Sequence, residues 1–192
     1  QVNAQSPADL VSDLYAVTGD ILHKKGEEQE AFAAYDSCLQ WKDDNVMALN
    51  NYAYYLSEKG VDLHKAESMS YKTIKAEPNN GTYLDTYAWI LFMEERYADA
   101  KIYIDQALKN RDSTADNSTV IEHAGDIYYM NGMADESVDF WKKAYTGENQ
   151  TEVLAWKIKN RQYITEEELK KRNAPKQKPA ATQKSVRKGK KK

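Results

Sequence analysis

The chain has 192 residues, 41% of them hydrophobic, and a formal net charge of −3 at neutral pH. That length is enough for one domain with a hydrophobic core, whereas the longest apolar runs, such as 87–93, are far too short for a membrane-spanning helix. The single cysteine, Cys38, excludes an internal disulfide bond and is expected to pack as a small apolar side chain.

The first predicted helix begins within residues 1–11, a lead-in to the repeated part of the chain. Ser6 precedes Pro7, and a hydroxyl followed by proline at the first helical position is typical of a helix N-terminus. Asp9 then places a carboxylate near the positive end of the helix dipole. We therefore expect Ser6 to cap this helix.

A pattern of bulky and small residues repeats four times between residues 12 and 151. Its copies begin near residues 12, 46, 81 and 118, at spacings of 34, 35 and 37 residues, which gives the units 12–45, 46–80, 81–117 and 118–151. The matching positions are Tyr15, Gly19, Leu22, Gly26, Ala31, Tyr35 and Cys38; Leu49, Ala53, Leu56, Gly60, Ala66 and the closing Pro78; Leu84, Ala88, Leu91, Ala100, Ile104 and Ala107; and Ile121, Gly125, Tyr128, Gly132, Ser137, Trp141 and Ala144. Spacings of this size predict one helical hairpin per unit.

Small residues and turn glycines give each predicted hairpin its geometry. A small residue in the first helix allows the second helix to approach closely, and the four such residues are Gly19, Ala53, Ala88 and Gly125. A glycine with positive φ is expected to end the first helix of three units, at Gly26, Gly60 and Gly132. In the third unit 94–96 replaces that glycine, at a modest conformational cost.

These positions resemble the tetratricopeptide repeat (TPR) family over residues 12–151. The stretches 50–56 and 76–89 look like the carboxy-terminal part of longer bacterial TPR proteins, many of which are exported to the cell envelope. The resemblance implies an all-α superhelix of antiparallel hairpins, nine to ten helices in all. Ser70 and Thr73 depart from the family pattern, in place of an aromatic residue and an alanine.

The location expected from the resemblance is periplasmic or cell-envelope associated, and a cytoplasmic location is left open. The chain begins with Gln1 and lacks the basic flank and apolar run of a secretion signal, so we expect a processed product or an excised piece.

Two further segments follow the repeats. Residues 152–173 are predicted to form a capping helix over the last hairpin and then a short helix, which Thr165 and Glu168 open with a capping box. Residues 174–192 contain eight Lys or Arg and no acid, which leaves 19 bases and 30 acids in residues 1–173. With almost no large apolar residue, this basic tail is expected to be disordered.

Nothing in the sequence indicates catalysis. The three histidines, His23, His64 and His123, lie in different units, and none has a second His or Cys three or four residues away. No phosphate-binding glycine loop and no nucleophile motif occurs. We therefore expect neither an enzyme nor a bound metal or cofactor.

The TPR resemblance implies that the first helix of each hairpin lines a concave groove. Stepping by the helical period gives the candidate groove residues Asp20, Asn50, Tyr54, Asp85, Trp89, Phe92, Met93, Glu122, Asp126, Tyr129 and Met130. Aromatic and methionine side chains flanked by acids suit a peptide with apolar anchors and Lys or Arg. The alternative that Trp89, Phe92 and Tyr129 simply pack between hairpins stays open.

The leading functional hypothesis is thus a non-catalytic scaffold that binds another protein or peptide in this groove. Two alternatives remain. The basic tail could attach the protein to an anionic membrane surface or, less favoured, to nucleic acid. The chain could instead be a structural end-segment of a longer solenoid.

Overall fold

The computed structural model describes residues 7–112, 115 and 117–174, and this part of the chain is all-helical. It contains ten α-helices, within the nine to ten that the sequence predicted, and one short 3₁₀ turn, Gly147–Asn149. The α-helices are α1 (Ala8–Lys24), α2 (Glu28–Trp41), α3 (Val46–Lys59), α4 (Leu63–Ala76), α5 (Gly81–Met93), α6 (Tyr97–Asn110), α7 (Ser118–Met130), α8 (Ala134–Ala144), α9 (Glu152–Asn160) and α10 (Glu166–Asn173).

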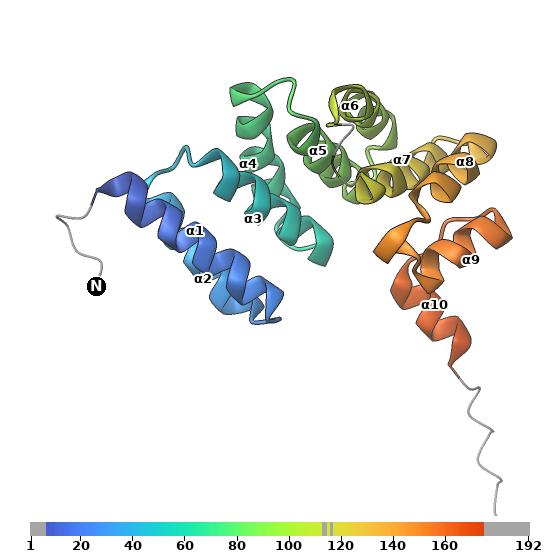
Figure 1. The fold of residues 1–192 in the computed structure, drawn as a ribbon, viewed down its shortest axis with the longest axis horizontal. Helices are drawn as coiled ribbons and strands as arrows, with labels where there is room; N and C mark the ends of the chain where they lie inside the picture. Colours follow the sequence, from blue (N-terminus) through green and yellow to red (C-terminus); the bar gives the residue numbers. More distant parts are fainter. Residues whose placement is uncertain (1–6, 113–114, 116, 175–192) are drawn as a thin grey trace, which may run out of the picture.

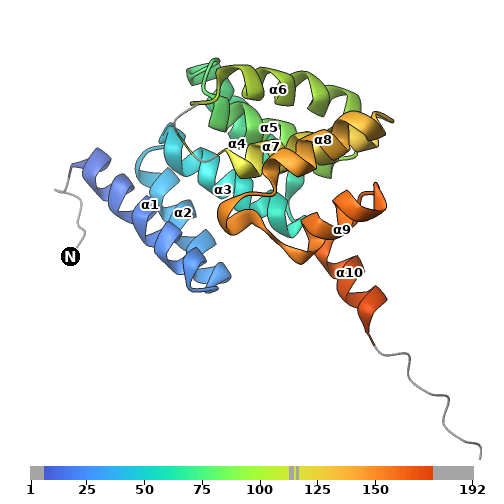
Figure 2. The same cartoon turned by 45° about the vertical axis from the view of Figure 1, so that its right-hand side comes forward.

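The first eight helices form four hairpins that follow one another along an arc, from the blue to the yellow end of the chain (Figure 1). Figure 2 shows α9 and α10 as a separate pair at the end of this arc. None of the helices in the described ranges is both long and apolar enough to span a bilayer. The Lys-rich residues 175–192, predicted to be disordered, lie outside the described residues.

The turns within the hairpins have the backbone conformation that the sequence predicted. Gly26, Gly60 and Gly132 have φ values of 78°, 63° and 79°. The third hairpin makes the same turn with Glu95, at φ 61°. A non-glycine residue is strained in this region by roughly 1–2 kcal/mol, a cost that the packing of α5 on α6 offsets.

The start of α1 differs from the prediction. Pro7 stands at the N-cap, and the first helical residue is Ala8. The ψ of Pro7 is 129°, which is extended and takes this residue out of the helix. Ser6, the predicted cap, lies outside the described residues.

The small residues of the repeat are the points of closest approach between paired helices. A Cβ atom on Gly125 would lie 2.4 Å from Cδ1 of Trp141, and one on Gly19 would lie 2.8 Å from Cζ of Tyr35. Ala53 and Ala88 are completely buried. The sequence prediction that these residues allow close packing is confirmed.

Two of the positions that depart from the family pattern still lie in the interior. Ser70 and Thr73 are fully buried in α4, where the Thr73 hydroxyl donates a 2.7 Å hydrogen bond to the Ser70 carbonyl. Cys38 is also fully buried, as expected, with its sulfur 3.1 Å from the Ser12 hydroxyl.

The segment after the hairpins forms the helices α9 and α10. Leu154 of α9 is fully buried against Val138 and Trp141 of α8, so α9 covers the last hairpin. Thr165 and Glu168 form the capping box of α10, in which each side chain accepts from the other residue's backbone N–H. Between α9 and α10 the chain turns back, with Arg161 at φ 55°.

Candidate functional site

A pocket of about 840 Å³ lies between the first helices of the last three hairpins and the segment α9–α10. We call it the inner pocket. Its apolar lining consists of Tyr54, Trp89, Met93, Val153, Tyr163, Ile164 and Leu169. Its acidic lining consists of Glu58, Glu122, Asp126, Glu152 and Glu166, against two lysines, Lys157 and Lys170. Acids therefore outnumber lysines on its walls.

One wall of the inner pocket belongs to a stack of aromatic rings, of which Trp89 and His123 line the pocket. Trp89 lies between Phe92 and His123, with ring centroids 4.8 Å and 4.1 Å apart and interplanar angles of 12° and 14°. Trp89 and Phe92 are only 9% and 5% exposed, so both are packed in the interior as well. The Nε1 atom of Trp89 is buried and has no hydrogen-bond acceptor among the described residues. The stack is thus a rigid part of the wall, and its one unused donor is buried within it.

His123 is held in this stack by a buried carboxylate. Its Nδ1 lies 3.0 Å and 3.1 Å from the two oxygens of Asp85, and both side chains are more than 90% buried. Burial by itself would lower the pKa of His123, but the Asp85 carboxylate outweighs it, and the pKa is raised above its usual 6.5. The imidazolium form therefore persists to higher pH than in an ordinary histidine.

This pair makes stability depend on pH. A histidine whose folded-state pKa is raised stabilises the fold fully below the unfolded-state value of about 6.5, and this contribution disappears as pH rises through the folded-state pKa. We expect His123→Gln to lower the free energy of unfolding by about 1.5–3 kcal/mol at pH 6, the value of a charge-assisted hydrogen bond, and by less at pH 9. Urea denaturation at both pH values measures the difference.

The exposed His64 provides the matched control, because it lies in α4 away from the pocket. His64→Gln should change stability little at either pH. An equal loss for His123→Gln at both pH values would contradict the assignment of the imidazolium form.

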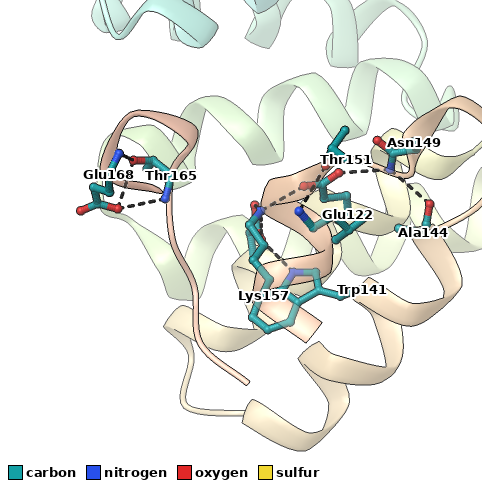
Figure 3. A network of polar contacts seen from close by, with 10 residues as sticks. Glu122, Trp141, Ala144, Asn149, Thr151, Lys157, Thr165 and Glu168 are labelled. Carbon is teal, nitrogen blue, oxygen red and sulfur yellow. Dashed lines mark hydrogen bonds and ion pairs between the residues drawn. The ribbon is translucent and has the colours of Figure 1, made fainter. Parts of the chain in front are cut away.

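The opposite wall carries a buried lysine. Nζ of Lys157 lies 2.8 Å from both oxygens of Asp126 and 3.0 Å from Oε1 of Glu122, and Lys157 is only 3% exposed. Trp141 Nε1 donates a 2.8 Å hydrogen bond to Asp126, and Asn149 Nδ2 donates a 3.1 Å bond to Glu122. Figure 3 shows Lys157 reaching from α9 toward Glu122, with the Trp141 indole beside it.

The charge of this lysine is retained despite its burial. Burial lowers the pKa of an ammonium group, but the carboxylates of Asp126 and Glu122 outweigh it, so the pKa of Lys157 is raised. Two of the acids predicted to receive a cation of a partner thus hold a cation of the same chain.

The predicted groove residues divide into two groups. Tyr54, Trp89, Met93, Glu122 and Asp126 line the inner pocket. The other six lie elsewhere, and among them Asp85 pairs with His123 behind the wall. Phe92 and Met130 pack in the central core, and Tyr129 packs near Trp141 and Tyr163. Asn50 is buried, and the Asp20 carboxylate accepts hydrogen bonds from Tyr35 and Asn51.

Sequence reasoning missed Lys157, Tyr163 and Leu169, which the fold-back of α9–α10 brings to the pocket. For Lys157 a signal existed. It lies three residues after Leu154, on the same face of α9 as that buried leucine, where an unpaired lysine would be unfavourable. No sequence spacing connects it to Asp126.

Comparisons with known proteins agree with this architecture. No family model matches the chain. It is similar to a TPR repeat-containing protein of Pseudomonas aeruginosa, with 35% identity over 66 residues, which are 34% of this chain and only 11% of that protein.

Three solved structures share the fold at low sequence identity. PilF of Pseudomonas aeruginosa superposes with a TM-score of 0.67 at 16% identity, over 81% of this chain and 69% of PilF. MamA of Desulfovibrio magneticus gives 0.59 at 13%, over 73% of this chain and 77% of MamA. YrrB, described as a TPR protein with an unusual peptide-binding site, gives 0.54 at 18%, over 77% and 74%.

The repeat spacing, the helical hairpins and these similarities agree on one fold, which is typical of non-catalytic scaffolds for protein interaction. The chain has the all-α superhelical fold of tetratricopeptide-repeat proteins.

Proposed function

We propose that the chain is a scaffold that binds a peptide or a protein segment in the inner pocket, and that this segment carries an apolar anchor beside Lys or Arg. The pocket itself is the observation that supports this. Its volume of about 840 Å³ is within the range of ligand-binding cavities, and it combines apolar walls with acids at its edge.

The two parts of the ligand correspond to two parts of the lining. Tyr54 and Met93, both half-buried, offer an aromatic and thioether surface on which an apolar side chain could pack, and the largely buried Trp89 supports them from the wall. Glu58 is exposed beside them and could meet a cation. Burial, followed by the Glu58 carboxylate, raises the pKa of Tyr54, so its hydroxyl remains a donor.

A substitution at the pocket edge tests the proposal without disturbing the core. Random dodecapeptides displayed on phage are selected on the wild-type chain, and we expect the enriched sequences to combine Lys or Arg with Leu, Phe or Tyr. Glu58→Lys should weaken the selected peptides about 5–20-fold, measured by fluorescence anisotropy, because it reverses the sign of one contacting charge.

Glu136→Lys is the matched control, since Glu136 is exposed on α8 and does not line the pocket. It makes the same change in net charge and should leave affinity within twofold. Equal weakening by both variants would mean that only net charge matters. Failure of any peptide to enrich would argue against the pocket as a binding site.

A further inference from the structure

The last helix, α10, and the linker before it form one wall of the inner pocket with only a few apolar side chains. Ile164 and Leu169 are 7% and 3% exposed, and both line the pocket. Every other side chain of α10 is exposed. Tyr163 packs edge-on against Phe92 of α5, with ring centroids 5.7 Å apart. The attachment of 161–174 to the inner helices therefore depends on three side chains.

Most polar contacts of α10 lie within the helix itself. Glu166 pairs with Lys170 and Glu167 pairs with Lys171, each one turn further along the helix. The capping box described above also belongs to α10 and its N-cap. These contacts would move with the helix, so separating α10 from the inner helices breaks none of them.

The remaining polar contacts join α10 to α9. Within the described part of the chain they are a 3.2 Å hydrogen bond from Nδ2 of Asn173 to Glu152 and the Arg172 guanidinium over the Trp156 ring. Glu152 and Trp156 both belong to α9. No hydrogen bond or ion pair between these described residues of α10 and the inner helices α3, α5 and α7 fixes the wall in place.

A strained residue lies at the junction between α9 and α10. Arg161 has φ 55° and ψ 36°, in the left-handed region that a non-glycine residue adopts at a cost. The helix before it is fixed, because Leu154 is fully buried and Lys157 is held by two carboxylates. A change of backbone angles at Arg161 would thus swing α10 and leave α9 in place.

The size of the pocket indicates that one wall moves when a peptide binds. A cavity of about 840 Å³ is in the range that holds a drug-sized molecule, and a dodecapeptide is larger. The inner helices α3, α5 and α7 are each packed on the second helix of their own hairpin. Among the walls of the pocket, α10 is the one that can move without opening a hairpin.

We propose that α10 is a hinged cover of the inner pocket, which swings open about Arg161 to admit the peptide and then closes on it. This inference rests on the peptide-binding function proposed above. The free protein is closed for most of the time, because opening exposes Ile164 and Leu169 to water. The open form is a minor population that the ligand uses to enter.

The reactivity of a buried thiol measures the opening of α10 without any ligand. Leu169→Cys places a thiol under α10, and Leu154→Cys places one under α9, where the leucine is also buried. A maleimide should react with the first thiol at least about 100-fold faster than with the second, because local opening costs less than unfolding the end of the array. The fully buried Cys38 is the internal reference in both variants. Equal rates for the two variants would overturn the proposal.

A cross-link tests whether this motion admits the ligand. Glu152→Cys with Asn173→Cys, joined by a short bismaleimide, ties α10 to α9 at the place of their hydrogen bond. The cross-link should slow association of the selected dodecapeptides at least about 20-fold relative to the same variant before cross-linking. Glu167→Cys with Lys171→Cys is the matched control, since both residues are exposed within α10 and do not line the pocket. Its cross-link should leave the association rate within about twofold.

The closed state around the ligand has its own test. A bound peptide should slow maleimide labelling of the Leu169→Cys variant at least about fivefold, because the ligand stabilises the closed form. Faster labelling would mean that the ligand displaces α10, and equal association rates with and without the first cross-link would mean that the ligand enters elsewhere. Either result would contradict the hinged cover. If no peptide enriches, the peptide-binding function fails by itself, and the thiol rates then decide whether α10 is hinged.

Discussion

Replacing Gly125 with alanine is expected to destabilise the protein by about 3 kcal/mol, although the same change in an exposed helix would stabilise it by about 1 kcal/mol. The new Cβ would lie 2.4 Å from Cδ1 and 2.5 Å from Nε1 of Trp141. Trp141 is completely buried between α7 and α9 and donates to Asp126, so it has little freedom to move. The two helices of the fourth hairpin must separate instead.

Thermal and urea denaturation followed by circular dichroism measure this effect. A background variant, Trp141→Leu, tests its cause, because a shorter and more flexible side chain leaves space for the added methyl group. In that background Gly125→Ala should cost less than about 1 kcal/mol, which makes the two changes strongly non-additive. An unchanged or higher melting temperature for Gly125→Ala alone would show that the helices do not pack as closely as described.

Replacing Lys157 with methionine is expected to destabilise the C-terminal end of the array by about 3–5 kcal/mol, the usual cost of removing one partner of a buried ion pair. Methionine preserves most of the apolar stem but leaves Asp126 and Glu122 without their cation. Asp126 is only 3% exposed, so water cannot replace the lost partner. Because hairpins mostly contact their neighbours in the array, α8 and α9 should open before the first hairpins do.

Amide hydrogen exchange resolved by segment measures where this opening occurs. Protection should fall in α7–α9 and change little in α1–α4. Lys159→Met is the matched control on the same helix, since Lys159 is exposed and should tolerate the change. Combining Lys157→Met with Asp126→Asn should recover part of the loss, because the more deeply buried of the two carboxylates no longer carries an unpaired charge, whereas the Glu122 side chain is 19% exposed. If the double variant is less stable than either single variant, the ion pair is not the cause.

The candidate site shows where sequence reasoning ends. Helical periodicity placed Tyr54, Trp89 and Asp126 on the inner helices, and all three line the inner pocket. The same periodicity could not distinguish a side chain that faces the pocket from one, such as Asp85, that turns to a buried histidine 38 residues away. Both kinds of side chain lie on the same face of a helix, and only the residues that surround them in the folded protein distinguish one kind from the other.

The sequence by itself determined the hairpins. Each hairpin depends on signals that lie close together in the sequence, such as a turn residue like Gly26 and a small residue like Gly125. Two helices joined by so short a turn have few alternatives to packing against each other. The tertiary structure alone decided how α9 and α10 fold back on the inner helices, which joins Lys157 to Asp126 across 31 residues. That contact depends on how α9 packs on the fourth hairpin, a geometry that no spacing within one repeat encodes.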